Sequence, residues 1–111
     1  MAGTGEQFLQ DIVRVIVDTV DPEQIVLFGS QARQDSGPAS DIDLLIVKSE
    51  PFDVVRSRRK EMALLWRALA RFPIAKDILL YSRDEVEYWR DSLNNVVARA
   101  LREGRVLYER P

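Results

Sequence analysis

The chain has 111 residues, of which 46% are hydrophobic and 31% charged, and its formal net charge is −2. These values favour one folded domain spanning residues 1–111 and argue against a disordered chain. The sequence contains no cysteine and no histidine, which excludes disulfides, thiolate zinc sites, serine triads and imidazole metal ligands. Any chemistry must use carboxylates, hydroxyls, backbone amides, lysine or arginine.

The charge pattern and the hydropathy pattern restrict the partners and the location. The slightly acidic balance gives no basic footprint for direct nucleic-acid binding. Thirteen of the 16 basic residues are arginines, which suit bidentate contacts to phosphate or carboxylate. No apolar run approaches the length that spans a bilayer, and the first residues carry no basic segment typical of a signal peptide. We therefore expect a cytoplasmic protein that does not bind membranes.

Helices and strands alternate in the predicted order. The apolar spacing predicts a helix over 7–20, which ends at Asp21-Pro22, and an inner strand over 25–28. A short helical turn over 31–33, a strand over 41–47, a long helix over 53–71 and a strand over 74–81 follow. Ser82 and Glu85 have the spacing of a capping box, which predicts the start of a helix. Ser92 is the expected N-cap of a last helix that ends at Glu103, and Gly104 is the expected left-handed residue after it. A terminal strand is predicted over 106–108. This order predicts an α/β or α+β fold with a mixed β-sheet and helices packed against it.

Two acids open the strand predicted over 41–47. Residues two apart in a strand point to the same face, so Asp41 and Asp43 project together while Ile42 and Leu44 line the opposite face. Two carboxylates at the start of a buried strand repel each other and lose hydration. A divalent cation offsets both effects, and oxygen ligands without histidine or cysteine suit Mg²⁺ or Mn²⁺.

A third acid is expected at the same edge of the sheet. Asp77 lies near the start of the strand predicted over 74–81, which follows a long crossover helix. Such a crossover favours a strand parallel to the one before it. We therefore expect Asp77 to lie beside Asp43. The alternative is an edge acid that pairs with Lys76 or an arginine.

The turn after the first strand supplies the complement to these acids. At Gly29 the backbone can approach a ligand closely, and a helical turn opening at Ser30 directs free N–H groups and partial positive charge outward. The alternative role of Ser30 is that of a helix N-cap. Three carboxylates, two metal ions and a phosphate-binding turn together make a nucleotidyl-transfer site.

The motif Gly29-Ser30-x10-Asp41-Ile42-Asp43 resembles that of the DNA polymerase β-like nucleotidyltransferase superfamily. Within it the chain is similar to a minimal nucleotidyltransferase (MNT), the antitoxin-type partner of HEPN toxins, over nearly its whole length. One departure is Gln34, where related sequences usually have glycine after the arginine that corresponds to Arg33.

The resemblance implies an activity and a set of site residues. The enzyme would transfer AMP from ATP to a tyrosine hydroxyl of a partner HEPN ribonuclease toxin. Asp41, Asp43 and Asp77 would hold two Mg²⁺ ions, with Asp77 also acting as the base. Gly29 and Ser30 would bind the β- and γ-phosphates, and Arg33 would either neutralise the triphosphate or lie on the surface.

Two other functions and two structural questions stay open at this point. The chain could be a non-catalytic antitoxin that masks its partner, or an enzyme that transfers nucleotides to a small molecule such as an aminoglycoside. The basic run over 56–60 is interpreted as a solvated helix face in preference to an interface. Trp66, Tyr88 and Trp89 are interpreted as core or interface residues in preference to base-stacking platforms.

Overall fold

The computed structural model describes residues 5–29, 42–55, 57–93 and 95–111. Within these ranges the elements are α1 (Gly5–Val20), β1 (Gln24–Phe28), β2 (Ile42–Lys48), α3 (Arg58–Leu69), β3 (Lys76–Ser82), α4 (Arg83–Trp89), α5 (Val96–Glu103) and β4 (Arg105–Glu109). The strands form one four-stranded sheet in the order β3-β2-β1-β4. Strand β1 is antiparallel to β2 and β4, whereas β2 and β3 are parallel. The predicted α+β fold with a mixed sheet is confirmed.

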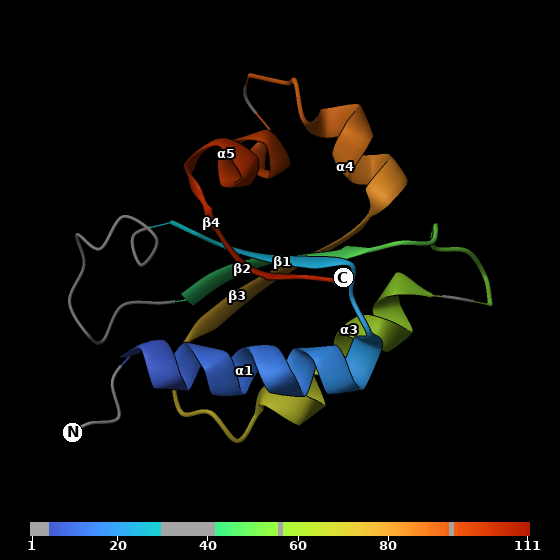
Figure 1. The fold of residues 1–111 in the computed structure, drawn as a ribbon. Coiled ribbons are helices and arrows are strands. Elements are labelled where there is room, and N and C mark those ends of the chain that lie inside the picture. Colours follow the sequence, from blue (N-terminus) through green and yellow to red (C-terminus); the bar gives the residue numbers. More distant parts are fainter. Residues whose placement is uncertain (1–4, 30–41, 56, 94) are drawn as a thin grey trace.

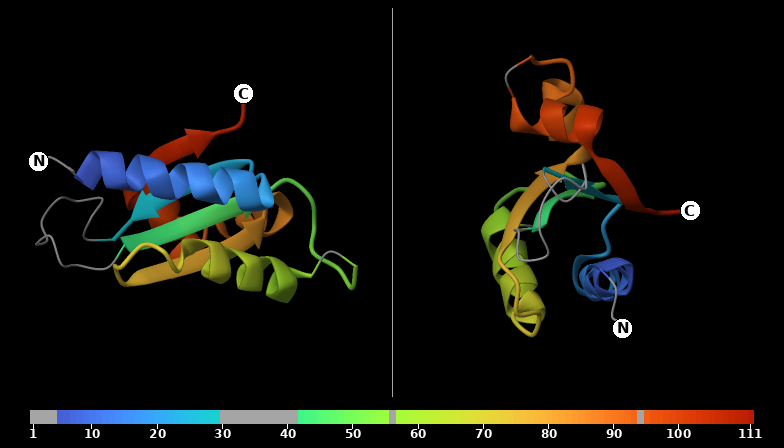
Figure 2. Two further views of the ribbon diagram at one scale, coloured as in Figure 1. Left: turned by 90° about the horizontal axis from the view of Figure 1, so that it is seen from below. Right: turned by 90° about the vertical axis from the view of Figure 1, so that its left-hand side faces the viewer.

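Helices cover both faces of the sheet. Figures 1 and 2 show α1 and α3 on one face and α4 and α5 on the other. The alternation of side chains along β2 explains this arrangement, because Leu44 and Ile46 join the apolar cluster under α1 and α3. Leu45 and Val47 point the other way and join the cluster that contains Val97 of α5. The two faces predicted for this strand are therefore the two faces observed.

Helix α1 buries one side against the sheet. Ile12 and Ile16 are fully buried one turn apart, as expected for an amphipathic helix. The helix ends where predicted, because Asp21 has a positive φ of 49° and Pro22 follows it. None of the helices in the described part of the chain has the length and apolar character needed to cross a membrane.

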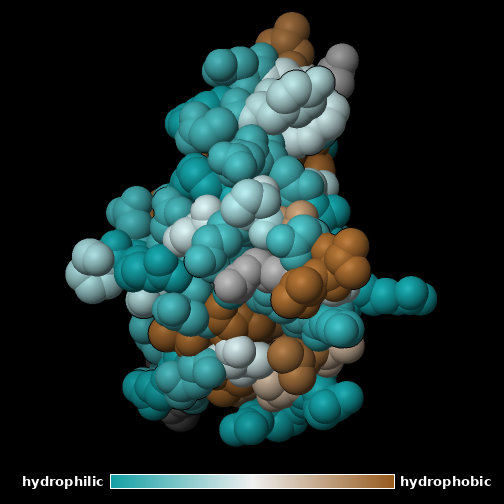
Figure 3. Space-filling model, turned by 90° about the vertical axis from the view of Figure 1, so that its right-hand side faces the viewer, coloured by the Kyte–Doolittle hydropathy of each residue, from teal (hydrophilic) through white to brown (hydrophobic). Residues whose placement is uncertain are grey.

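The helix predicted over 53–71 begins later than expected. Helix α3 starts at Arg58, and the Ser57 side chain caps it by accepting a hydrogen bond from the backbone N–H of Lys60. Val54 and Val55 precede this cap and are 93% and 89% exposed. Figure 3 shows that hydrophobic side chains reach the surface on the lower half of the face drawn there. Both valines lie within the range predicted for the helix and outside the helix observed, so the predicted start is wrong. A serine cap competes well with β-branched residues that have low helix propensity, which explains the later start.

The C-terminal third contains one confirmed cap and two corrections. Ser82 and Glu85 form the predicted capping box at the start of α4. Asn95, not Ser92, caps α5 by accepting from the N–H of Val97. Gly104 has a φ of −85°, so it is not left-handed. A glycine is needed there because a Cβ would stand 2.4 Å from the carbonyl oxygen of Ala100.

The three aromatic residues interpreted as core or interface are not core. Tyr88 is 77% exposed, and Trp66 and Trp89 are also exposed. Tyr88 and Trp89 contact each other edge to face, with ring centroids 4.8 Å apart. These two rings therefore pack on each other at the end of α4, outside the apolar core.

Candidate active site

Asp43 and Asp77 lie side by side on neighbouring strands. They are register partners in the parallel pair of β2 and β3. Register partners on adjacent strands lie about 4.8 Å apart and point to the same face of the sheet. Here that face is the one covered by α4 and α5, because Leu45 and Leu79, two residues further along each strand, both contribute to the cluster under these helices. The predicted placement of the third acid beside the second is confirmed.

Strand β1 brings the glycine turn to the same place. Phe28 pairs with Asp43 in the antiparallel ladder, so the residue after Phe28 lies next to the Asp43 carboxylate. Gly29 has a φ of +79°, and a Cβ built on it would stand 2.3 Å from Oδ2 of Asp43. Both the backbone conformation and the close approach require glycine. The turn is thus in contact with the carboxylate.

The two described acids differ in their surroundings. Asp43 lies on an inner strand and is half-buried, whereas Asp77 lies on the edge strand β3 and is exposed. Lys76, the neighbour proposed as an alternative partner for Asp77, instead donates to the carbonyl oxygens of Phe72 and Ile74. The exposed position of Asp77 leaves it accessible to a ligand or an incoming hydroxyl group.

Three predicted site residues, Ser30, Arg33 and Asp41, lie outside the described residues, as does the turn predicted over 31–33. In the part of the chain that the structure describes, no group of three or more histidine, cysteine or acidic side chains is arranged to hold a metal ion. That part holds two of the three acids expected to do so. Carboxylates are ligands that Mg²⁺ prefers, so Asp43 and Asp77 fit a magnesium site in their chemistry.

Helix α5 completes a pocket beside Asp43 that sequence reasoning did not find. The pocket has a volume of about 180 Å³ and is lined by Phe28, Gly29, Asp43, Val96, Arg99 and Glu103. Val96, Arg99 and Glu103 are spaced i, i+3 and i+7, so they share one face of the helix. The only signal in the sequence was this helical spacing, which does not reveal what the face packs against.

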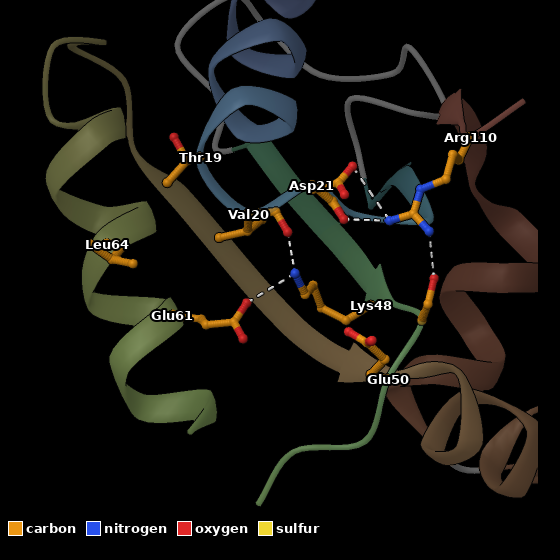
Figure 4. Close-up of a pocket in the computed structure, with 9 residues that line it drawn as sticks. Thr19, Val20, Asp21, Lys48, Glu50, Glu61, Leu64 and Arg110 are labelled. Carbon is orange, nitrogen blue, oxygen red and sulfur yellow. Dashed lines mark hydrogen bonds and ion pairs between the residues drawn. The ribbon is translucent and has the colours of Figure 1, made fainter. Parts of the chain in front are cut away.

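A larger pocket of about 470 Å³ lies at the other end of β2, away from the acids (Figure 4). Lys48 lines this pocket; it follows the strand predicted over 41–47, but it is the last residue of β2 and only 6% exposed. The Lys48 Nζ donates to the carbonyl oxygen of Val20 at the end of α1 and forms an ion pair of 3.2 Å with Glu61 of α3. These two contacts join α1, β2 and α3, which gives Lys48 a structural role.

A sheet that brings a glycine turn against an acid pair is typical of nucleotidyltransferases, and comparisons with known proteins agree. Residues 10–111 match the family described as "Polymerase beta, Nucleotidyltransferase". The chain therefore belongs to the polymerase β-type nucleotidyltransferase family.

A curated relative and several solved structures resemble the chain. It is 29% identical to the "Putative protein adenylyltransferase" of Methanocaldococcus jannaschii over 89 residues, which covers 74% of this chain and 87% of that protein. A "putative nucleotidyltransferase" of Sulfolobus solfataricus has a TM-score of 0.64 at 19% identity, covering 95% of this chain and 80% of that one. A mutant of the toxin–antitoxin MntA–HpeT has a TM-score of 0.61 at 16% identity, covering 92% and 72%. A toxin–antitoxin with AMP-PNP has a TM-score of 0.52 at 21% identity, covering 96% and 75%. At these identities the solved structures establish the likeness of the fold.

Proposed function

We infer that this chain is a magnesium-dependent adenylyltransferase of one domain that transfers AMP from ATP to a hydroxyl group. The observation that carries this proposal is the contact of the Gly29 turn with Asp43, whose register partner is Asp77. The name of the M. jannaschii relative supports protein adenylylation, and the AMP-PNP in one structural neighbour supports an adenine nucleotide as donor.

The transfer is a substitution at the α-phosphorus of ATP. The acceptor oxygen forms a bond to the α-phosphorus while the bond to the oxygen that bridges to the β-phosphate breaks, and pyrophosphate leaves. The hydroxyl proton passes to a carboxylate, for which Asp77 is placed best because it is exposed beside Asp43. The backbone of the Gly29-Ser30 turn would bind the leaving phosphates.

Bound Mg²⁺ would stabilise negative charge on the entering and leaving oxygens. The residues that would hold it are Asp41, Asp43 and Asp77. Without a cation, the neighbouring carboxylates repel the triphosphate, so Asp43 and Asp77 also make nucleotide binding depend on the metal. Arg33, which follows the Gly29-Ser30 motif in the sequence, would offset phosphate charge.

The proposed acceptor is a tyrosine of a partner HEPN ribonuclease toxin, with the chain acting as its antitoxin in the cytoplasm. The toxin–antitoxin neighbours support a toxin as partner.

The test is label transfer from [α-³²P]ATP with Mg²⁺ to the protein encoded next to this gene. We expect the unmodified chain to label the partner and Asp43→Asn to abolish labelling while the fold is kept or stabilised, because the substitution relieves carboxylate repulsion. The matched control is Asp18→Asn on α1, an exposed acid on the other side of the sheet, which should label normally.

Three results would change the assignment. Unchanged labelling by Asp43→Asn would remove the acid pair from the chemistry. A tight complex without labelling by the unmodified chain would favour a masking antitoxin. Labelling of an aminoglycoside, detected by mass spectrometry, would favour the small-molecule enzyme.

A further inference from the structure

One wall of the small pocket beside Asp43 carries a positive charge. Arg99 lies on α5 and lines the pocket together with Gly29 and Asp43. Helix α5 packs on the sheet, because its Val97 and Ala100 are buried in one apolar cluster with Val26 of β1. Asn95 caps its start, and Gly104 at its end fits closely against Val26 and the carbonyl oxygen of Leu27 on β1. The guanidinium is therefore attached to a well-anchored helix opposite the glycine turn.

Arg99 differs from the arginines that hold the surface of this protein together. Five arginines form ion pairs with carboxylates of the chain: Arg58, Arg83, Arg90, Arg105 and Arg110. Within the described ranges no carboxylate oxygen lies within the 4.0 Å ion-pair distance of Arg99, although Asp43 and Glu103 line the same pocket. An arginine preceding a glutamate by four residues is the less favourable order for a helical pair. The guanidinium is thus available to a ligand.

We propose that Arg99 binds the β- and γ-phosphates of the nucleotide donor, opposite the Gly29 turn. This rests on the proposed function and adds to it a specificity-determining residue that the motif does not contain. The planar guanidinium forms two parallel hydrogen bonds with phosphate oxygens, which suits a triphosphate. The Gly29 turn supplies backbone contacts from β1 and Arg99 supplies charge from α5, so the two sides of the pocket would hold the leaving pyrophosphate between them.

The position of Arg99 predicts discrimination by phosphate number. ATP and ADP carry phosphates beyond the α-phosphate, whereas AMP has none for Arg99 to bind. A residue that only supports the fold would affect all three nucleotides alike or affect none. Nucleotide selectivity therefore separates a binding role from a structural one without requiring the acceptor protein.

The experiment is isothermal titration of the full chain with ATP and Mg²⁺, ADP and Mg²⁺, and AMP. Arg99→Gln should weaken ATP binding about 10- to 100-fold, the range for charge-assisted hydrogen bonds, and leave AMP binding within about twofold. Arg99→Lys keeps the charge but loses the planar fork, so it should recover part of the affinity. Arg102→Gln is the matched control, since Arg102 lies on the same helix but does not line the pocket, and its ATP affinity should equal that of the unmodified chain.

The results distinguish the proposed role of Arg99 from the proposed adenylyltransferase function on which it rests. If the unmodified chain binds no ATP, both fail. If it binds ATP and Arg99→Gln binds it equally well, only the role of Arg99 is refuted. Equal weakening of ATP and AMP, or equal weakening by Arg102→Gln, would also refute a specific contact to the β- and γ-phosphates. Circular dichroism verifies that each variant is folded. If Arg99→Gln does not fold, the ATP affinity of Arg99→Lys is compared with that of the unmodified chain instead.

Discussion

The contact between Gly29 and Asp43 makes one substitution a sharp test of the site. In Gly29→Ala the new Cβ would stand 2.3 Å from Oδ2 of Asp43. An ordinary contact between carbon and oxygen is about 3.3 Å, so the carboxylate must move by about 1 Å. A displacement of that size at a reacting group costs about 10²-fold in rate. We expect the rate of AMP transfer to fall by that factor.

The same substitution has a separate and smaller effect on stability. Gly29 has a φ of +79°, and a left-handed conformation costs an alanine about 1–2 kcal/mol. For a chain of this size that lowers the unfolding midpoint by about 4 °C per kcal/mol. The clash is with the end of a flexible side chain and not with backbone atoms, so the Asp43 carboxylate can move without a shift of the backbone. The activity should therefore fall much more than the folded fraction does.

The matched control is Gly104→Ala, a second glycine-to-alanine change with a steric conflict. Its Cβ would meet the carbonyl oxygen of Ala100 at 2.4 Å and that of Leu27 at 2.8 Å. Backbone atoms cannot rotate away, so we expect a loss of stability at least as large. Because any shift of α5 also moves Arg99, we expect ATP binding to weaken, but at saturating ATP the rate per folded molecule should fall much less than in Gly29→Ala. Rates are measured below both unfolding midpoints, and the midpoints come from circular dichroism. If Gly29→Ala keeps its full rate per folded molecule, or if Gly104→Ala loses as much, the contact with Asp43 does not matter for the chemistry.

Three further predictions concern stability. Ser82→Ala removes the capping box of α4 and should lower the free energy of unfolding, measured by urea denaturation, by about 1 kcal/mol. An unchanged free energy of unfolding would show that water replaces the cap. Lys48→Met leaves Glu61 without its partner and should lower the free energy of unfolding by about 3 kcal/mol, the lower end for a broken buried pair. Changing Glu61 to leucine as well should recover much of this loss. If the losses of the two single variants simply add in the double variant, the pairing is contradicted. The hydrogen bond from Arg83 holds the pKa of Glu23 below its ordinary value, so the interaction stabilises the fold near neutral pH and is lost as the pH falls through the lowered pKa. Glu23→Gln should therefore be less stable than the unmodified chain near neutral pH, and this difference should shrink as the pH falls through the lowered pKa of Glu23. Thermal melts that show the same difference at neutral and at acid pH would contradict this.

Local patterns determined the elements that depend on neighbours in the sequence. The alternation over 42–47 set the two faces of β2, because successive side chains of a strand point in opposite directions. The spacing of Ser82 and Glu85 predicted a cap that uses only local atoms. The crossover helix predicted that β2 and β3 are parallel, and with it the pairing of Asp43 and Asp77.

The tertiary structure decided what these elements pack against. The spacing of residues in the sequence cannot show that α5 packs on β1. The sequence therefore did not predict that Arg99 lies in the same pocket as Asp43, or that the close packing at Gly104 requires a glycine. The burial of Lys48 depends on contacts with both α1 and α3 at the end of β2, and these two helices are far apart in the sequence. The periodicity of apolar residues indicates which side of a helix or strand is buried. Which other element covers that side is decided by packing between segments that are distant in the sequence. The sequence alone therefore determined the class of fold and the acid motif, and only the assembled sheet and helices determined the walls of the pocket around it.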